Sequence, residues 1–225
     1  MTRERVMEIV PTARTKNERP TLRGLNLSSL DLSGLDLSGA DLRDTNLSYS
    51  NLSHANLRNT NMAYANMHRT NLHYANLAFA NLHNVAATRA ELSDTILRHT
   101  FMHRADLTGA NLSRAYMYST NFRGADLSGT KMCGLFLDGL PSGRLILSPT
   151  PEGWHLTIGC WDGTVVELRE MIAENDDWPE ARGEEITVRR PMLETMATAC
   201  ETYAAAHPNA LDEVRKTAER WEKNR

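Results

Sequence analysis

The sequence has few aromatic residues, few cysteines and no long apolar run. Phe, Trp and Tyr make up 6% of its 225 residues, so any core must consist of aliphatic side chains and methionine. Three cysteines cannot pair completely, which argues against a disulfide-stabilised secreted fold. No apolar run approaches the ~18–20 residues of a membrane span, and the first residues show no charged-then-apolar leader. We therefore expect a soluble cytoplasmic protein without a membrane association.

The sequence also lacks a charge excess and the motifs of common enzymes. Lys+Arg 25 against Asp+Glu 28 gives a net charge of −3, which argues against both a strongly basic nucleic-acid binder and a strongly acidic decoy. There is no glycine-rich phosphate loop, no G-x-S-x-G and no H-E-x-x-H. Cys133, Cys160 and Cys200 have neither C-x-x-C spacing nor a histidine at metal-ligand spacing. We expect no enzyme activity, no cofactor and no metal site.

A five-residue period is present through the middle of the chain. With the central residue of each unit called position i, the frame runs from Leu22 to Leu137 without an insertion, which makes 24 consecutive units. Position i is Leu, Met or Phe in 23 of them, and Ala87 is the exception. Position i−2 is mostly small, and position i−1 is Asn or Asp in 16 of the 24. Such a frame indicates a repeat architecture, which takes precedence over any assignment of single helices or strands.

The chemistry of one unit predicts how it folds. Side chains two positions apart on an extended segment point the same way, so i−2 and i face one side and i−1 faces the other. Positions i+1 and i+2 are polar and rich in Ser, Gly and Asn, which is typical of a turn. One unit buries one large and one small side chain and is too small to be stable alone. The units must therefore coil and stack on one another.

These units, such as ANLRN, ANMHR and ANLAF, resemble the pentapeptide-repeat family, whose motif is A-(D/N)-L-x-x. The resemblance covers Pro20 to Gly139, about half of the chain. It implies an all-β solenoid, a right-handed quadrilateral β-helix with one coil per four units and about six coils. The period alone does not distinguish four sides from three.

The flanks are predicted to cap this solenoid. In residues 1–19, Val6, Met7, Ile9 and Val10 are expected to lay a short strand or turn over the first coil. Residues 140–225 are expected to form a small α+β cap or domain. Its predicted elements are a hairpin of residues 143–148 and 153–161, a helix from about 164 to 175 with a Thr164–Glu167 capping box, a helix from Pro191 to about Ala206, and a helix capped by Asn209. The segment GWHLTIGCWDGTVVELREMI is similar to pentapeptide-repeat proteins of phages and prophages, for which the location is the host cytoplasm.

A basic strip is the first candidate site. If coils repeat every 20 residues, the i+1 column of the face that contains Leu22 has basic residues and no acid, although Asp41 and Asp44 lie next to it. The basic strip comprises Arg23, Arg43, His83, His103, Arg104 and Arg123. It is either ordinary solvated charge or a site for an acidic partner or a phosphate backbone.

An apolar stripe is the second candidate. On the face that contains Leu37, the i−1 column ends in large apolar residues where Asn or Asp is expected, and an exposed stripe of this kind needs a covering partner. The apolar stripe comprises Ile96, Tyr116 and Phe136 of this column, Tyr118 alongside it and Phe101 on the adjoining face. The hairpin or a helix of the same chain would cover it, or else a second copy in a homodimer, or a separate partner.

The function that these observations favour is a non-catalytic interaction or scaffold protein that binds a protein partner through a rigid solenoid face, preferably the basic strip. The resemblance implies an alternative, the binding of DNA gyrase or topoisomerase IV by imitation of duplex DNA. Residues 20–139 contain ten Lys+Arg and nine Asp+Glu, a net charge of +1 that argues against such mimicry and equally against direct nucleic-acid binding.

Overall fold

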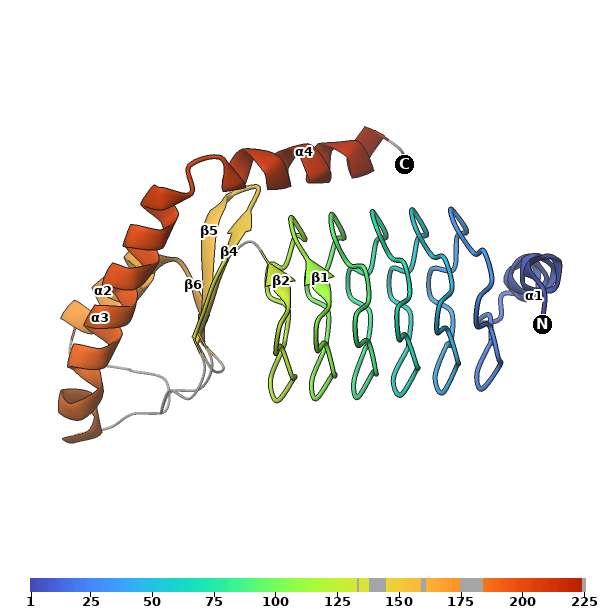
Figure 1. Ribbon diagram of the computed structural model, residues 1–225, viewed down its shortest axis with the longest axis horizontal. Coiled ribbons are helices and arrows are strands. Elements are labelled where there is room, and N and C mark those ends of the chain that lie inside the picture. The colour runs from blue at the N-terminus through green and yellow to red at the C-terminus, as the bar shows by residue number, and fades with distance from the viewer. Residues whose placement is uncertain (133, 138–144, 159–160, 175–183, 224–225) are drawn as a thin grey trace. The chain divides into compact units, whose positions relative to one another are not determined.

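Parallel backbone pairing between residues 20 positions apart organises the first part of the chain in the computed structural model (Figure 1). The structure describes all residues except 133, 138–144, 159–160, 175–183 and 224–225. It contains two compact units, Met1–Met132 with Thr217–Arg225, and Cys133–Lys216. Among the described helices, none has the length and apolarity needed to cross a bilayer.

The first unit is built from bridges that join residue n to residue n+20, from Thr21↔Asp41 to Asp106↔Asp126. After the bridge Asp106↔Asp126, the same pairing continues between two short parallel strands, β1 (Asn111–Leu112) and β2 (Lys131–Met132). Since every bridge spans four five-residue units, one coil contains four units. This periodicity confirms that the repeat frame sets the fold.

The turn chemistry of each unit explains the preference for Asn at i−1. Asn71 is representative: its Oδ1 accepts a hydrogen bond from the backbone N–H of His73 at 3.0 Å, while its Nδ2 donates to Asn51 Oδ1 of the preceding coil at 3.1 Å. The next residue, Tyr74, has φ 57°, in the left-handed region. The Asn side chain thus holds the turn that directs the chain around the corner.

The core of this unit contains the i and i−2 side chains, as predicted. Leu72 and Leu77 are fully buried, and so are the small residues Thr70 and Ala75. Buried threonine hydroxyls donate to backbone carbonyls; for example, Thr70 Oγ1 lies 2.7 Å from the Leu47 oxygen. Because such a bond satisfies the hydroxyl of a buried Thr, the solenoid core accepts Thr as well as Ala at position i−2.

A helix, α1 (Arg3–Thr15), precedes the first coil, and the expectation of a strand or turn there is wrong. Thr2 caps the helix by accepting from the Arg5 N–H at 3.3 Å, and Val6 and Val10, one helical turn apart, are buried. The Arg3 guanidinium donates to the carbonyl oxygens of Asp31 at 2.6 Å and Ser33 at 3.0 Å. In later coils the equivalent carbonyls accept from the preceding coil, so arginines satisfy them where no preceding coil exists.

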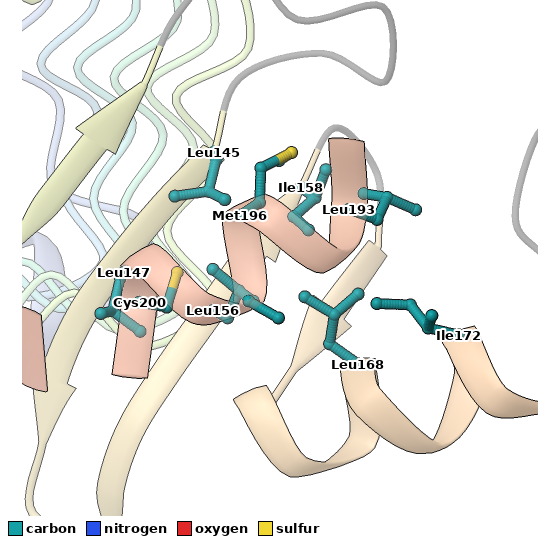
Figure 2. Packing of buried hydrophobic residues seen from close by; sticks show 10 residues of the cluster. Leu145, Leu147, Leu156, Ile158, Leu168, Ile172, Leu193, Met196 and Cys200 are labelled. Carbon is teal, nitrogen blue, oxygen red and sulfur yellow. The ribbon is translucent and has the colours of Figure 1, made fainter. Parts of the chain in front are cut away.

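The second unit contains a four-stranded antiparallel sheet in the order β3-β4-β5-β6. A hydrophobic cluster packs between this sheet and α2 and α3, with Leu145, Leu156, Leu168 and Met196 among its buried members (Figure 2). The elements of this unit are β3 (Leu135–Leu137), β4 (Leu145–Thr150), β5 (Gly153–Ile158), β6 (Trp161–Gly163), α2 (Val165–Ala173) and α3 (Glu184–Ala206). The last helix, α4 (Ala210–Lys223), is divided between the two units, since residues from Thr217 on belong to the first.

Several expected elements are confirmed, namely the hairpin of β4 and β5, the end of α3 at Ala206 and the start of α4 after Asn209, and two expectations need correction. The Thr164–Glu167 capping box at the start of α2 is present. α3 begins at Glu184 rather than Pro191, because the preceding Glu and Arg residues favour helix and continue it upstream of the proline. Leu135–Leu137, predicted as the last repeat unit, pairs antiparallel with β4 instead.

Candidate functional site

The outward side chains of one solenoid face contain the basic strip. The bridges Asn61↔Asn81, Asn81↔Phe101 and Phe101↔Asn121 place the equivalent residues of successive coils next to one another. His83 and His103 consequently stack, with ring centroids 5.2 Å apart and planes inclined by 11°. The arithmetic of a 20-residue coil therefore locates this column correctly.

The N-terminal half of the basic strip is neutralised by the acids beside it. Arg23 Nε lies 3.1 Å from Asp44 Oδ2. Arg43 donates from Nε and Nη2 to the two carboxylate oxygens of Asp41, at 2.9 and 2.6 Å. This hydrogen bonding from Arg43 lowers the pKa of Asp41 to about 2. Arg23 and Arg43 thus behave as ordinary paired surface charges.

The C-terminal half keeps its charge unpaired. Arg104 and Arg123 are both exposed, and neither forms an ion pair with any residue that the structure describes. Gly124 lies against Arg104, since a Cβ at that glycine would be 3.4 Å from Arg104 Cγ. The unpaired positive charge of the basic strip is therefore that of Arg104 and Arg123.

An open groove of about 730 Å³ lies along the same face. Three aromatic side chains in its wall are exposed: Phe101 at 55%, Tyr64 at 57% and Phe79 at 37%. Its lining also includes Arg19, Arg43, His83 and His103. Sequence reasoning missed Tyr64 and Phe79, although both stand at i+2 on consecutive corners and a 20-residue column listing would have placed them beside the basic strip.

The apolar stripe does not form a continuous exposed surface. Ile96 and Tyr116 are buried, each 8% exposed, so this chain already covers them, in agreement with the alternative that the stripe is covered by its own chain. Tyr118 is half-buried and packs edge-on against His99, at 5.4 Å between ring centroids. Phe101 belongs to the groove described above. The side chain of Phe136, the remaining predicted member, lies outside the described part of the structure.

One cluster brings together residue types that catalyse acyl transfer elsewhere, but its geometry does not fit such a reaction. His73 Nδ1 lies 2.7 Å from Ser93 Oγ and 3.7 Å from Asp94 Oδ2. A nucleophile and an orienting acid must bond to opposite ring nitrogens, whereas both approach the same one here. Asp94 is instead held by two hydrogen bonds from Arg114, at 2.9 and 2.6 Å. The cluster ties adjacent coils together.

The described part of the chain contains neither a reactive cysteine nor a cluster of metal ligands. Burial raises the pKa of the Cys200 thiol to about 11, which keeps it protonated and unreactive. Cys133 and Cys160 lie outside the described residues. Within the described ranges, no group of three or more His, Cys, Asp or Glu side chains is arranged to hold a metal ion.

Several solved structures are similar to this chain, although none among the curated proteins matches it. HetL, a pentapeptide repeat protein involved in heterocyst differentiation regulation in the cyanobacterium Nostoc sp. strain PCC 7120, is 27% identical over 54% of this chain and 70% of its own, with a TM-score of 0.36. Rfr23 from the cyanobacterium Cyanothece 51142 is 21% identical over 57% of this chain and 95% of its own, with a TM-score of 0.30. A trypsin-treated form of QnrB1, a plasmid-mediated fluoroquinolone resistance protein, is 18% identical over 52% of this chain and 68% of its own, with a TM-score of 0.30.

These TM-scores are low, so the assignment rests on the repeats. A family model for pentapeptide repeats matches eight copies, at residues 20–48, 50–85, 88–124 and 103–139. The matched ranges coincide with the five-residue frame and with the bridges between residues 20 apart. The chain belongs to the pentapeptide repeat family, whose members fold as right-handed quadrilateral β-helices.

Proposed function

We propose that this protein is a non-catalytic binding module that engages a protein partner through the solenoid face of the basic strip. The observation that carries the proposal is the combination, on one face, of two unpaired exposed cations, Arg104 and Arg123, with a groove that exposes Phe101. Unpaired charge beside exposed aromatic area is the composition of a binding surface, because neither contributes to the stability of the isolated fold.

The interior of the solenoid argues against catalysis. Its axis is filled by fully buried side chains such as Leu72, Leu77 and Leu82, which leave no room for a substrate between the coils. The groove is an open surface feature, and its lining includes no nucleophile paired with a base. Recognition by a rigid outer face is the function that this arrangement supports.

Imitation of duplex DNA is the weaker candidate. A DNA mimic needs a dense row of acids, but residues 20–139 carry ten basic and nine acidic side chains, and the face with the groove is basic. The fluoroquinolone-resistance role of QnrB1 is a property of that protein. We expect the purified protein to leave DNA gyrase supercoiling unchanged at equimolar concentration, and inhibition there would favour mimicry instead.

The proposal is tested by reversing the unpaired charges. The double variant Arg104→Glu/Arg123→Glu should lower partner capture in a quantitative pull-down by about tenfold or more, which corresponds to at least ~1.4 kcal/mol of binding free energy. Its melting temperature should stay close to that of the parent, because both side chains are exposed. Capture should also weaken as salt rises, since the screening length falls from ~8 Å at physiological ionic strength to ~3 Å at 1 M.

A matched control is available on the neighbouring face. Arg69 and Arg89 occupy position i+2, as Arg104 does, and both are exposed. The variant Arg69→Glu/Arg89→Glu makes the same change in net charge away from the groove and should capture the partner normally. Equal loss in both double variants would mean that only net charge matters, and no loss in either would refute the proposed face.

A further inference from the structure

We propose that the groove binds a short acidic segment of a polypeptide, with one apolar side chain of that segment seated on Phe101 and its carboxylates facing His103, Arg104 and Arg123. This inference rests on the proposed function, because it names the chemistry that the same face recognises. Three features of the described residues support it: the replacement at position 101, the state of the neighbouring rings, and the charge of the groove lining.

Phe101 occupies a position where Asn normally holds the turn. In the preceding coil, Asn81 Oδ1 accepts from the backbone N–H of His83 at 3.0 Å, and in the next coil Asn121 Oδ1 accepts from Arg123 at 2.9 Å. A phenyl ring offers no such acceptor to His103. The chain therefore gives up a stabilising hydrogen bond at this position and exposes more than half of an aromatic side chain, a combination that favours a binding role over a packing role.

The neighbouring rings are already engaged, which leaves one free apolar anchor. Phe79 stacks on His99 with centroids 4.9 Å apart and lies under the guanidinium groups of Arg58 and Arg98, at 5.1 and 5.3 Å. His83 stacks on His103, and the Tyr64 and His83 rings form a T-shaped pair with centroids 5.6 Å apart. Phe101 makes no ring or cation–π contact with any described residue.

A single free ring suits a peptide better than a nucleic acid. Proteins that bind single strands offer a row of free ring faces on which successive bases stack. Among the aromatic side chains in the groove wall, Phe101 is the one that makes no ring or cation–π contact with a described residue, which matches one apolar side chain.

The charge of the groove selects an acidic occupant. The residues that line it include Arg19 and two histidines but no Asp or Glu, and Arg43 in its wall is paired with Asp41. The unpaired arginine charge on this face is that of Arg104 and Arg123. The site is also preorganised, because Phe101 is fixed between coils by its N–H donating to Ala80 O at 3.0 Å and its carbonyl accepting from Leu82 N at 2.7 Å.

Fluorescence anisotropy with the full-length protein and labelled decapeptides tests the inference. The first probe has four Glu on each side of a central Leu pair. The second has Ala in place of Leu, and the third has Lys in place of Glu. A ten-residue oligo-dT is the fourth. We expect the first probe to bind at least about tenfold more tightly than each of the others, and to be released by salt.

The decisive variant is Phe101→Asn, which restores the common residue of the repeat. It should reduce binding of the first probe by about tenfold or more while leaving the melting temperature equal or higher, since Asn can accept the His103 N–H. Ala86→Asn is the matched control: Ala86 also replaces Asn at i−1, is exposed, and lies on the adjoining face. This control should bind the probe as the parent does.

Each remaining outcome contradicts the inference. Tighter binding of oligo-dT than of the first peptide would assign the groove to nucleic acid, and undiminished peptide binding by Phe101→Asn would remove Phe101 from the site. Absence of peptide binding would also overturn it. If Arg104→Glu/Arg123→Glu still abolished partner capture in that case, the proposed face would stand and only the acidic-segment inference would fail.

Discussion

Leu72 lies at the centre of the solenoid core, and its truncation measures how rigid the stack of coils is. The side chain is fully buried. Its N–H donates to Glu91 O at 2.8 Å, its carbonyl accepts from Ala75 N at 2.8 Å, and the preceding Asn71 N–H donates to Ser50 O at 2.9 Å. Because the backbone is hydrogen-bonded to coils on both sides, the cavity left by Leu72→Ala cannot collapse. We expect a loss near the upper part of the usual range, about 3–5 kcal/mol.

The assay is thermal unfolding followed by circular dichroism. With ~2–4 °C per kcal/mol for a protein of this size, Leu72→Ala should lower the melting temperature by about 10 °C. Met7→Ala, at a half-exposed position of α1, should change the free energy of unfolding by no more than ~0.5 kcal/mol. Leu72→Asp should abolish cooperative folding, because a buried unpaired charge costs several kcal/mol. A melting temperature for Leu72→Ala within 2 °C (about one assay error) of the parent would refute the rigid-stack reasoning.

Two further predictions concern the N-terminal part of the solenoid. The pKa of Asp41 falls from 3.8 to about 2 on folding, so its carboxylate stabilises the fold above pH 3.8 and loses this effect as pH falls towards 2. Asp41→Asn should therefore cost about 1–2 kcal/mol at pH 7, allowing for the partial exposure of Arg43, and almost nothing at pH 2, as measured by denaturant unfolding at each pH. Arg14→Ala removes hydrogen bonds to Asp36 Oδ2 at 2.7 Å and Ser38 O at 3.1 Å. It should speed amide hydrogen exchange in α1 and the first coil while leaving the centre of the solenoid unchanged.

The five-residue frame predicted the solenoid interior well because it encodes which side chains point inward. Once i and i−2 are recognised, burial of residues such as Leu72 and Thr70 follows from strand geometry alone. The number of units per coil did not follow from the period, and came from the family resemblance. The α1 helix was not predicted, although Val6, Met7, Ile9 and Val10 have the spacing of one helix face and only Val6 and Val10 are buried.

The candidate site was less predictable, because it depends on contacts across coils. The column arithmetic placed His83 beside His103 correctly, but it does not show that Arg43 turns towards Asp41 while Arg104 remains unpaired. Nor does it show that Ile96 is buried. Side-chain direction and covering by other segments are set by packing, which a repeat pattern does not encode.

The position of Phe101 within the repeat suggests how a uniform solenoid acquires a binding site. In four successive units, which make one whole coil, position i−1 is neither Asn nor Asp. The residues there are Ala86, Glu91, Ile96 and Phe101. Glu91 still accepts from the Ser93 N–H at 3.3 Å and from Asn111 Nδ2 at 2.7 Å, so it keeps the acceptor role of the Asn oxygen, although a carboxylate cannot donate to the preceding coil.

The other three residues lose the side-chain bond, yet the bridges Ala86↔Asp106, Ile96↔Tyr116 and Phe101↔Asn121 persist. The backbone ladder and the filled core therefore suffice to hold this coil, and its i−1 side chains are free to vary. Of the three, Ile96 is buried and Ala86 is too small to anchor a partner. Of these residues, only Phe101 places exposed apolar surface beside the unpaired charge of Arg104 and Arg123. We therefore expect the binding site at this coil and on this face.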